Sequence, residues 1–180
     1  MIEDGRAKES EQEMKIAEKK NVAKYRLYSL AYGMIKDSID CNCPLQAVAI
    51  EESILTDRLS STLNVGRQKA TPKDSLGRAL REWKPKKSSD SRNRNAALFD
   101  SEMNELFPRL EAWWEERCFL LHGLVKSPQG GCQDVAPEDF VARAVKAAKV
   151  GLLLTRKVDN WTKRQIQKAR TAPKNEGSNA

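Results

Sequence analysis

The chain has little of what marks several common protein classes. Its 180 residues include four cysteines, nine glycines and seven prolines, which excludes a disulfide scaffold, a collagen-like repeat and a low-complexity chain. The longest plainly apolar run, Val150–Leu154, is far too short to cross a membrane. The first residues have no basic start followed by an apolar segment, as a secretory signal would. We therefore expect a cytoplasmic protein with free thiols and no membrane contact.

The composition fits one globular domain with charged ends. Hydrophobic residues make up 39% of the chain and charged residues 32%, with 32 Lys and Arg against 25 Asp and Glu, a net charge of +7. Residues 1–20 alternate in charge and contain no aromatic residue, which indicates a charged N-terminal arm, helical or disordered. We expect a single helical domain over residues 21–170 and a disordered tail over residues 171–180.

The spacing of the apolar residues predicts helices throughout. No segment alternates apolar and polar residues as a strand would. The first helix is expected to be well buried. Its apolar stripe consists of Tyr25, Tyr28, Tyr32, Ile35 and Ile39, and is widened by Leu27, Leu30, Ala31 and Met34. Further helices are expected from Pro44, from Thr71, from about Asp100 and from Pro137. The fold class is therefore all-α, a bundle of about five helices.

Basic residues gather in two segments. Residues 67–94 hold ten basic and three acidic residues, and residues 156–174 hold seven basic residues against Asp159 alone. Such segments are typical of surfaces that track a polyanion, although well-solvated loops and helix ends look the same. RNA is the expected ligand, and the candidate contacts are Lys84, Lys86, Lys87, Arg92, Arg94, Lys163 and Arg164.

The residues best suited to chemistry lie on the expected fourth helix. His122 is the only histidine, and Arg117 falls on an apolar stripe between Trp113 and Leu121. A guanidinium there is costly unless it meets an anion. Five residues correspond to about 140° around a helix, so Arg117 and His122 should diverge unless the helix loosens at Gly123. A second subunit that completes the site is the other way to bring them together.

An acidic residue interrupts the apolar face of the second helix. Glu52 completes the helical spacing between Val48 and Leu55, where an apolar residue is expected. We expect its carboxylate to pair with Arg117 or to orient His122.

The spacing from Arg117 to His122, with Glu116 before the arginine and Gly123 after the histidine, resembles the R-x4-H signature of the HEPN superfamily. The likeness covers roughly residues 21–165, and the segment Glu51–Leu59 resembles the acid-bearing helix of that family. It implies a HEPN-like bundle that acts as a homodimer with a composite active site and cleaves RNA without metal or cofactor. Arg117 and His122 would be catalytic and Glu52 and Glu116 supporting.

The resemblance also implies a biological setting and a chemistry. The family resemblance implies a role as a toxin or in phage defence, in which a neutralising or regulatory protein partner is possible. A ribose 2′-OH would attack the adjacent phosphate, His122 would move protons, and Arg117 would offset the developing charge. The products would carry 2′,3′-cyclic phosphate and 5′-OH ends, and two copies of His122 could divide the base and acid roles.

Other functional interpretations stay open at the level of sequence. Cys118 stands where active family members usually have a polar residue, and this departure keeps open a non-catalytic module that binds RNA, a nucleotide or a partner. Leu124 stands where one toxin branch of the family has a tyrosine. Glu52 and Arg117 could be a structural ion pair with His122 as a helix cap. The N-terminal arm could instead dock a protein partner.

Two kinds of cysteine chemistry are weaker alternatives. A zinc site would need Cys41, Cys43 and Cys132 with His122, but the C-x-C spacing is not that of a usual zinc knuckle. Cys118 lies one helical turn before His122, as a nucleophile beside its base would, yet a cysteine on an apolar helix usually only packs.

Overall fold

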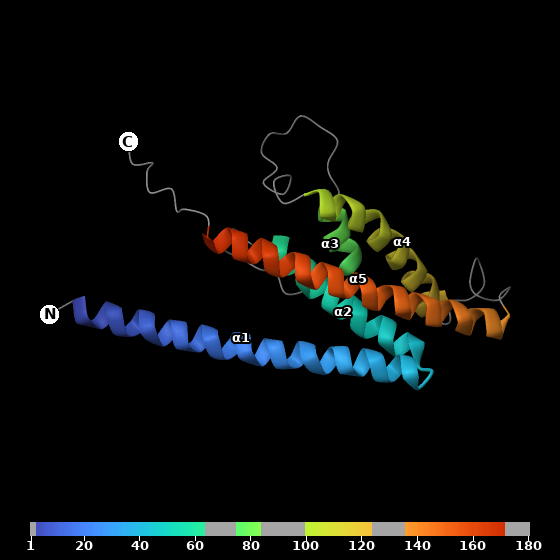
Figure 1. Ribbon diagram of the computed structural model, residues 1–180, viewed down its shortest axis with the longest axis horizontal. Helices are drawn as coiled ribbons and strands as arrows, with labels where there is room; N and C mark the ends of the chain where they lie inside the picture. Colours follow the sequence, from blue (N-terminus) through green and yellow to red (C-terminus); the bar gives the residue numbers. More distant parts are fainter. Residues whose placement is uncertain (1–2, 64–74, 84–99, 124–135, 172–180) are drawn as a thin grey trace, which may run out of the picture.

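The computed structural model describes residues 3–63, 75–83, 100–123 and 136–171. The prediction of an all-α bundle is confirmed, because this part of the chain forms helices and no strand. None of its helices is long and apolar enough to cross a membrane. The elements are α1 (Glu3–Asp40), α2 (Pro44–Leu63), α3 (Leu76–Trp83), α4 (Ser101–Gly123) and α5 (Pro137–Thr171) (Figure 1).

Helix α2 is the centre of the bundle. It packs along α5, with α1 on one side and α3 and α4 on the other (Figure 1). The two central helices run in the same direction, since Arg58 pairs with Asp159 at 2.6 Å and, further along, Thr62 hydrogen-bonds Thr162 at 3.3 Å. Helix α4 runs against α5, so the end of α4 lies beside the start of α5.

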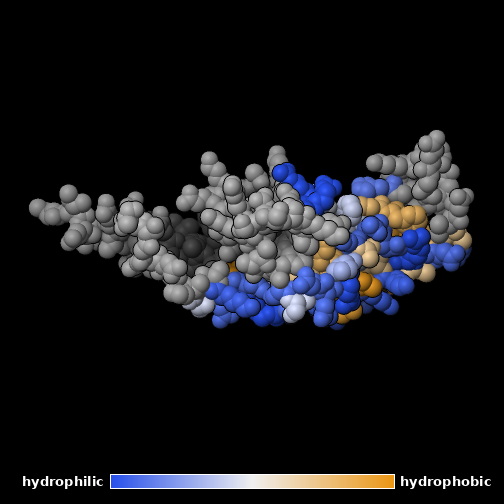
Figure 2. Space-filling model, turned by 90° about the horizontal axis from the view of Figure 1, so that it is seen from above, coloured by the Kyte–Doolittle hydropathy of each residue, from blue (hydrophilic) through white to orange (hydrophobic). Residues whose placement is uncertain are grey.

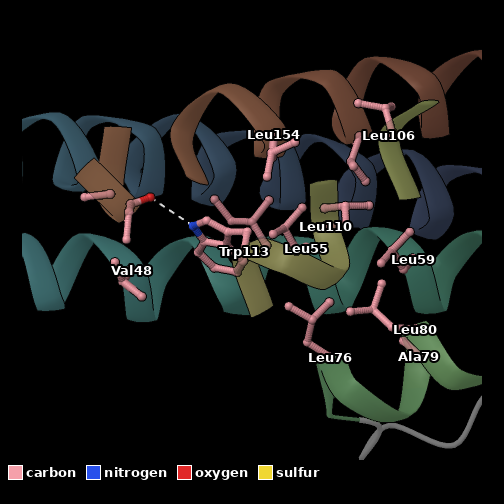
Figure 3. Packing of buried hydrophobic residues seen from close by; sticks show 14 of the residues in the cluster. Val48, Leu55, Leu59, Leu76, Ala79, Leu80, Leu106, Leu110, Trp113 and Leu154 are labelled. Atoms are coloured by element: carbon pink, nitrogen blue, oxygen red, sulfur yellow. Dashed lines mark hydrogen bonds between the residues drawn. The ribbon is translucent and has the colours of Figure 1, made fainter. Parts of the chain in front are cut away.

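The core forms where α2, α3, α4 and α5 meet, and α1 adds Ile35 to it. Large side chains from these helices point toward one another, and the Trp113 indole N–H donates to the carbonyl of Ala147 at 2.9 Å (Figure 3). Full burial of one large apolar side chain contributes about 1.5–3 kcal/mol. The largest fully buried apolar residues are Trp161, Ile35, Leu55, Leu59, Leu76, Met103, Leu110, Leu120, Leu154 and Val48.

Helix α4 begins where the sequence predicts. Asp100 caps it by accepting a hydrogen bond from the Met103 N–H at 3.0 Å. The same carboxylate accepts from Trp161 Nε1 at 3.0 Å and Gln165 Nε2 at 2.7 Å on α5. One acidic residue thus fixes both the start of α4 and its packing on α5.

Two details of the predicted helices are wrong. The third helix begins at Leu76 and not at Thr71, because Ser75 lies outside it and accepts the Arg78 N–H. The first helix is only partly buried: Ile35 lies in the core and Tyr28, Tyr32 and Ile39 pack against it, as predicted, but the residues expected to widen the stripe are largely exposed. Among the described elements, α1 packs mainly on α2 and α5. Its exposed large apolar residues are Val22, Tyr25, Leu27, Leu30 and Met34.

Polar side chains cover most of the coloured surface seen from above, with a hydrophobic patch toward the right-hand end (Figure 2).

Helix α1 runs without a break from Glu3 across the expected arm boundary at residue 20. Its inner face packs on α2 through an ion pair, a hydrogen bond and a cation–π contact. Lys24 pairs with Asp57 at 2.8 Å, Tyr28 donates a hydrogen bond to the same carboxylate, and Arg58 stacks on the Tyr28 ring.

Candidate functional site

The Arg117 side chain leaves α4 toward α2 and is only 14% exposed. Its Nη2 forms an ion pair with Glu52 Oε2, which brings together two of the residues that the sequence singled out. Its Nη1 also lies 3.9 Å from the sulfur of Cys118. The predicted anion opposite Arg117 is therefore Glu52.

The imidazole of His122 completes the cluster. Arg117 Nη1 donates a hydrogen bond to His122 Nε2 at 2.9 Å. Because a guanidinium can only donate, Nε2 is unprotonated in this arrangement and the ring proton lies on Nδ1. His122 is exposed on the last turn of α4, so its ring is open to a ligand.

The Arg117–His122 contact forms within one chain. On a regular helix the two side chains should diverge, yet α4 stays helical to Gly123 and they still meet. The reach of the arginine side chain makes this possible. A second subunit is not needed to bring these two residues together.

Glu116 points away from the cluster, onto α5. Its carboxylate accepts two hydrogen bonds from Arg143, at 2.8 and 2.7 Å, and the Arg143 guanidinium lies 4.0 Å from the centroid of the Phe119 ring. In the described residues Glu116 therefore holds the end of α4 against the start of α5. Sequence reasoning missed Arg143, which carries no motif.

Sequence reasoning also missed Glu51 as a buried acidic residue. It is fully buried, and neither of its carboxylate oxygens has a hydrogen-bond partner among the described residues. Burial raises the pKa of this carboxyl to about 9. It lies against Gly151, where a Cβ would fall 2.0 Å from Glu51 Oε2. Helical spacing from Val48 and Leu55 admits residue 51 as well as residue 52, so the signal was present in the sequence.

The predicted RNA contacts divide into two groups. Lys163 pairs with Asp159 at 2.8 Å and Arg164 with Glu102 at 2.5 Å, and both cations are about half exposed. A phosphate group would therefore compete with those carboxylates. The remaining candidates lie outside the described residues: Lys84, Lys86, Lys87, Arg92 and Arg94.

The cysteines are dispersed. Cys41 and Cys43 are exposed in the turn before α2, Cys118 is half-buried beside Arg117, and Cys132 lies outside the described residues. Within the described ranges, no group of three or more His, Cys, Asp or Glu side chains is arranged to hold a metal ion.

Comparisons with protein-family models, with curated proteins and with solved structures find no match to this chain. The candidate site therefore rests on its own geometry.

Proposed function

We propose that the protein is a metal-independent endoribonuclease whose reaction centre is the cluster of Arg117, His122 and Glu52. The observation that carries this proposal is the 2.9 Å contact between a held guanidinium and an exposed imidazole within one chain. A cation that can hold a phosphate and a group that can move a proton at neutral pH are what metal-free RNA cleavage requires. The resemblance to the HEPN superfamily supports the same reaction.

The arrangement suggests a division of roles. Glu52 holds one edge of the Arg117 guanidinium. When a phosphate binds, Arg117 Nη1 turns from His122 Nε2 to a non-bridging phosphate oxygen, which frees the lone pair of Nε2. His122 Nε2 then takes the proton of the ribose 2′-OH as that oxygen attacks phosphorus, and the bond to the 5′-oxygen breaks. A second imidazole then donates a proton to the departing 5′-oxygen. The products carry a 2′,3′-cyclic phosphate and a 5′-OH.

The second imidazole is the reason to propose a homodimer with a composite active site. Each chain has one histidine, and one ring cannot be base and acid in the same step. His122 of a second copy can supply the acid, because His122 lies exposed at the end of α4. A toxin or phage-defence role, with a neutralising or regulatory protein partner, follows only from the family resemblance.

One observation favours the alternative, a non-catalytic module that binds RNA, a nucleotide or a partner. The Glu52–Arg117 pair is largely enclosed, as structural ion pairs that fix the register of two helices are. On this account the same residues recognise a ligand or hold α2 to α4 without chemistry.

Cleavage of mixed cellular RNA in excess EDTA distinguishes the two functions. We expect the parent protein to cleave and His122→Ala to be slower by about 10²–10⁴-fold, because proton transfer contributes about that factor. Arg117→Ala should be slower by about 10²–10³-fold through loss of charge stabilisation. Binding of RNA without cleavage by the parent protein would favour the non-catalytic module.

The matched control is Arg109→Ala. Arg109 is an exposed arginine on α4, away from Glu52 and His122, so its removal changes net charge equally and leaves the proposed centre intact. Circular dichroism of every variant checks that its helices are retained. Equal loss of activity in Arg109→Ala would refute the assignment of Arg117.

A further inference from the structure

A pocket of about 280 Å³ lies where the turn between α1 and α2 meets the first turns of α5. Its wall is mainly apolar and comes from α2, through Pro44 and Leu45, and from α5, through Phe140, Val141 and Ala144. Phe140 is half-buried and Val141 is 43% exposed, so the pocket opens to solvent.

Asn42, Cys43 and Gln46 also line the pocket, and Asn42 and Gln46 each carry a carboxamide group. Asn42 has a φ of 56°, a left-handed conformation that asparagine tolerates better than most residues. The turn is closed by the Cys43 N–H, which donates to the Ser38 carbonyl at 2.7 Å. The position of Asn42 is thus set by the backbone of a tight turn.

None of the described residues that line this pocket carries a charged side chain. These residues therefore offer no counter-charge to a phosphate or an acidic peptide. An uncharged ring would find apolar walls, one aromatic side chain and two groups that can each donate and accept hydrogen bonds. Single-stranded RNA is recognised in this way, by stacking of its bases on aromatic rings and by hydrogen bonds to their edges.

The pocket lies at the same end of the bundle as the proposed reaction centre. On α2, Leu45 precedes Glu52 by two turns on the same helix face, about 10 Å along the axis. On α5, Phe140 precedes Arg143 by three residues, and Arg143 holds Glu116 beside Arg117. The turn between α1 and α2, the start of α5 and the end of α4 meet at this end (Figure 1).

We propose that this pocket binds one nucleobase of a single-stranded RNA whose backbone runs to Arg117 and His122. The inference rests on the proposed function for its location, and it adds a site that selects sequence. Phe140 contributes stacking, which is tolerant of base identity, and Gln46 and Asn42 contribute the choice between bases.

The test measures binding in the His122→Ala background, in which the RNA stays intact. Fluorescence anisotropy at low salt gives the affinity for four short single-base RNA oligomers and for a ribose-phosphate oligomer that lacks bases. The base-containing oligomers should bind about 5- to 150-fold more tightly than the baseless one, the range expected for one stacked base.

Three substitutions in this background assign that preference to the pocket. Phe140→Ala should abolish the difference between oligomers with and without bases. Phe140 is half-buried, so a second variant is needed that does not disturb packing. Gln46→Ala meets this need, because Gln46 is exposed and its loss leaves the fold intact. This variant should change which base binds best. The control is Leu30→Ala, which removes a 61%-exposed apolar side chain on α1 and should change nothing.

The outcomes separate this inference from the proposed function. If the parent protein cleaves RNA but Phe140→Ala and Gln46→Ala keep the full base preference, the pocket is not a base site although the function stands. If the parent protein does not cleave, and Phe140→Ala still abolishes base-dependent binding, the pocket stands without the catalysis. Equal binding of all five oligomers by the His122→Ala protein overturns the inference.

Discussion

Arg117 contacts both an anion and a neutral base, and this combination defines the candidate site at the level of single residues. Glu52 lowers the cost of placing a guanidinium between α2 and α4, and His122 Nε2 accepts one of its remaining hydrogen bonds. A charged residue on an apolar stripe was the sequence signal for both Arg117 and Glu52. Their contact could therefore be predicted, whereas the reach of Arg117 to His122 could not.

Glu52→Gln keeps the shape of the side chain and removes its charge. We expect the free energy of unfolding to fall by about 1–3 kcal/mol, since a mostly buried guanidinium loses a charge-assisted hydrogen bond. The comparison variant is Glu102→Gln, whose partner Arg164 is half exposed and whose loss should cost about 0–1 kcal/mol. Urea unfolding measures both, and equal effects would show that burial of the Glu52 pair adds nothing.

Glu51 makes stability depend on pH in a direction set by its burial. Its pKa is about 9 in the folded protein, against an ordinary value near 4.5, so the unfolded chain loses this proton first. The free energy of unfolding should therefore fall, by about 1 kcal/mol or more, as pH rises from about 5 to about 9. Urea titrations of the parent and of Glu51→Met measure this. Glu51→Met should lack this part of the decline in the free energy of unfolding. A pH profile identical to that of the parent protein would contradict the assignment to Glu51.

At the scale of whole helices, the contact between α2 and α5 depends on one small residue. At Gly151 an added Cβ would fall 2.0 Å from Glu51 Oε2 and 2.7 Å from Trp113 Nε1. At Gly33 on α1 a Cβ would meet nothing within 4 Å. These two glycines, each within a helix, therefore provide a matched pair of positions for substitution by alanine.

Gly151→Ala should lower the free energy of unfolding by about 1–3 kcal/mol, because the two helices must move apart. Gly33→Ala should raise it by about 0.5–1 kcal/mol through helix propensity alone. Thermal unfolding followed by circular dichroism measures both. A stabilising Gly151→Ala would show that α5 can shift without cost.

Asp100 joins two elements, and its removal should cost more than the loss of a helix cap. Asp100→Ala removes the cap of α4 and the acceptor shared by Trp161 and Gln165, so we expect about 2–4 kcal/mol of destabilisation. Asn104→Ala, at an exposed position of the same helix, should change stability by less than about 0.5 kcal/mol. Chemical denaturation checks the difference, and a cost below about 1 kcal/mol for Asp100→Ala would contradict this role.

Sequence patterns predicted where helices begin better than they predicted what packs against each helix. Helical spacing and Pro44, Asp100 and Pro137 predicted the starts of three helices, because capping depends on residues close in sequence. Burial of α1 was overestimated, because Leu27 and Leu30 fit an apolar stripe while the number of neighbouring helices is a tertiary property. The choice between Glu51 and Glu52 as the buried acid was likewise set by the position of α5.

At the scale of the whole molecule, the proposed mechanism uses two copies of the chain. His122 is the only histidine in the sequence, so an imidazole that acts as the acid is supplied by His122 of a second copy. We expect sedimentation velocity to show a dimer, and the specific cleavage activity to fall when dilution converts dimers into monomers. Full activity of a monomer over the same range would contradict the composite site.

The chemistry of the RNA ends tests the central claim most directly. Fragments made in excess EDTA by the parent protein should carry 2′,3′-cyclic phosphate and 5′-OH ends, because in the proposed reaction the 2′-oxygen is the nucleophile and His122 moves the protons. Neither His122→Ala nor Arg117→Ala should produce them at a comparable rate. Fragments with 3′-OH and 5′-phosphate ends, or undiminished cleavage by His122→Ala, would contradict the account.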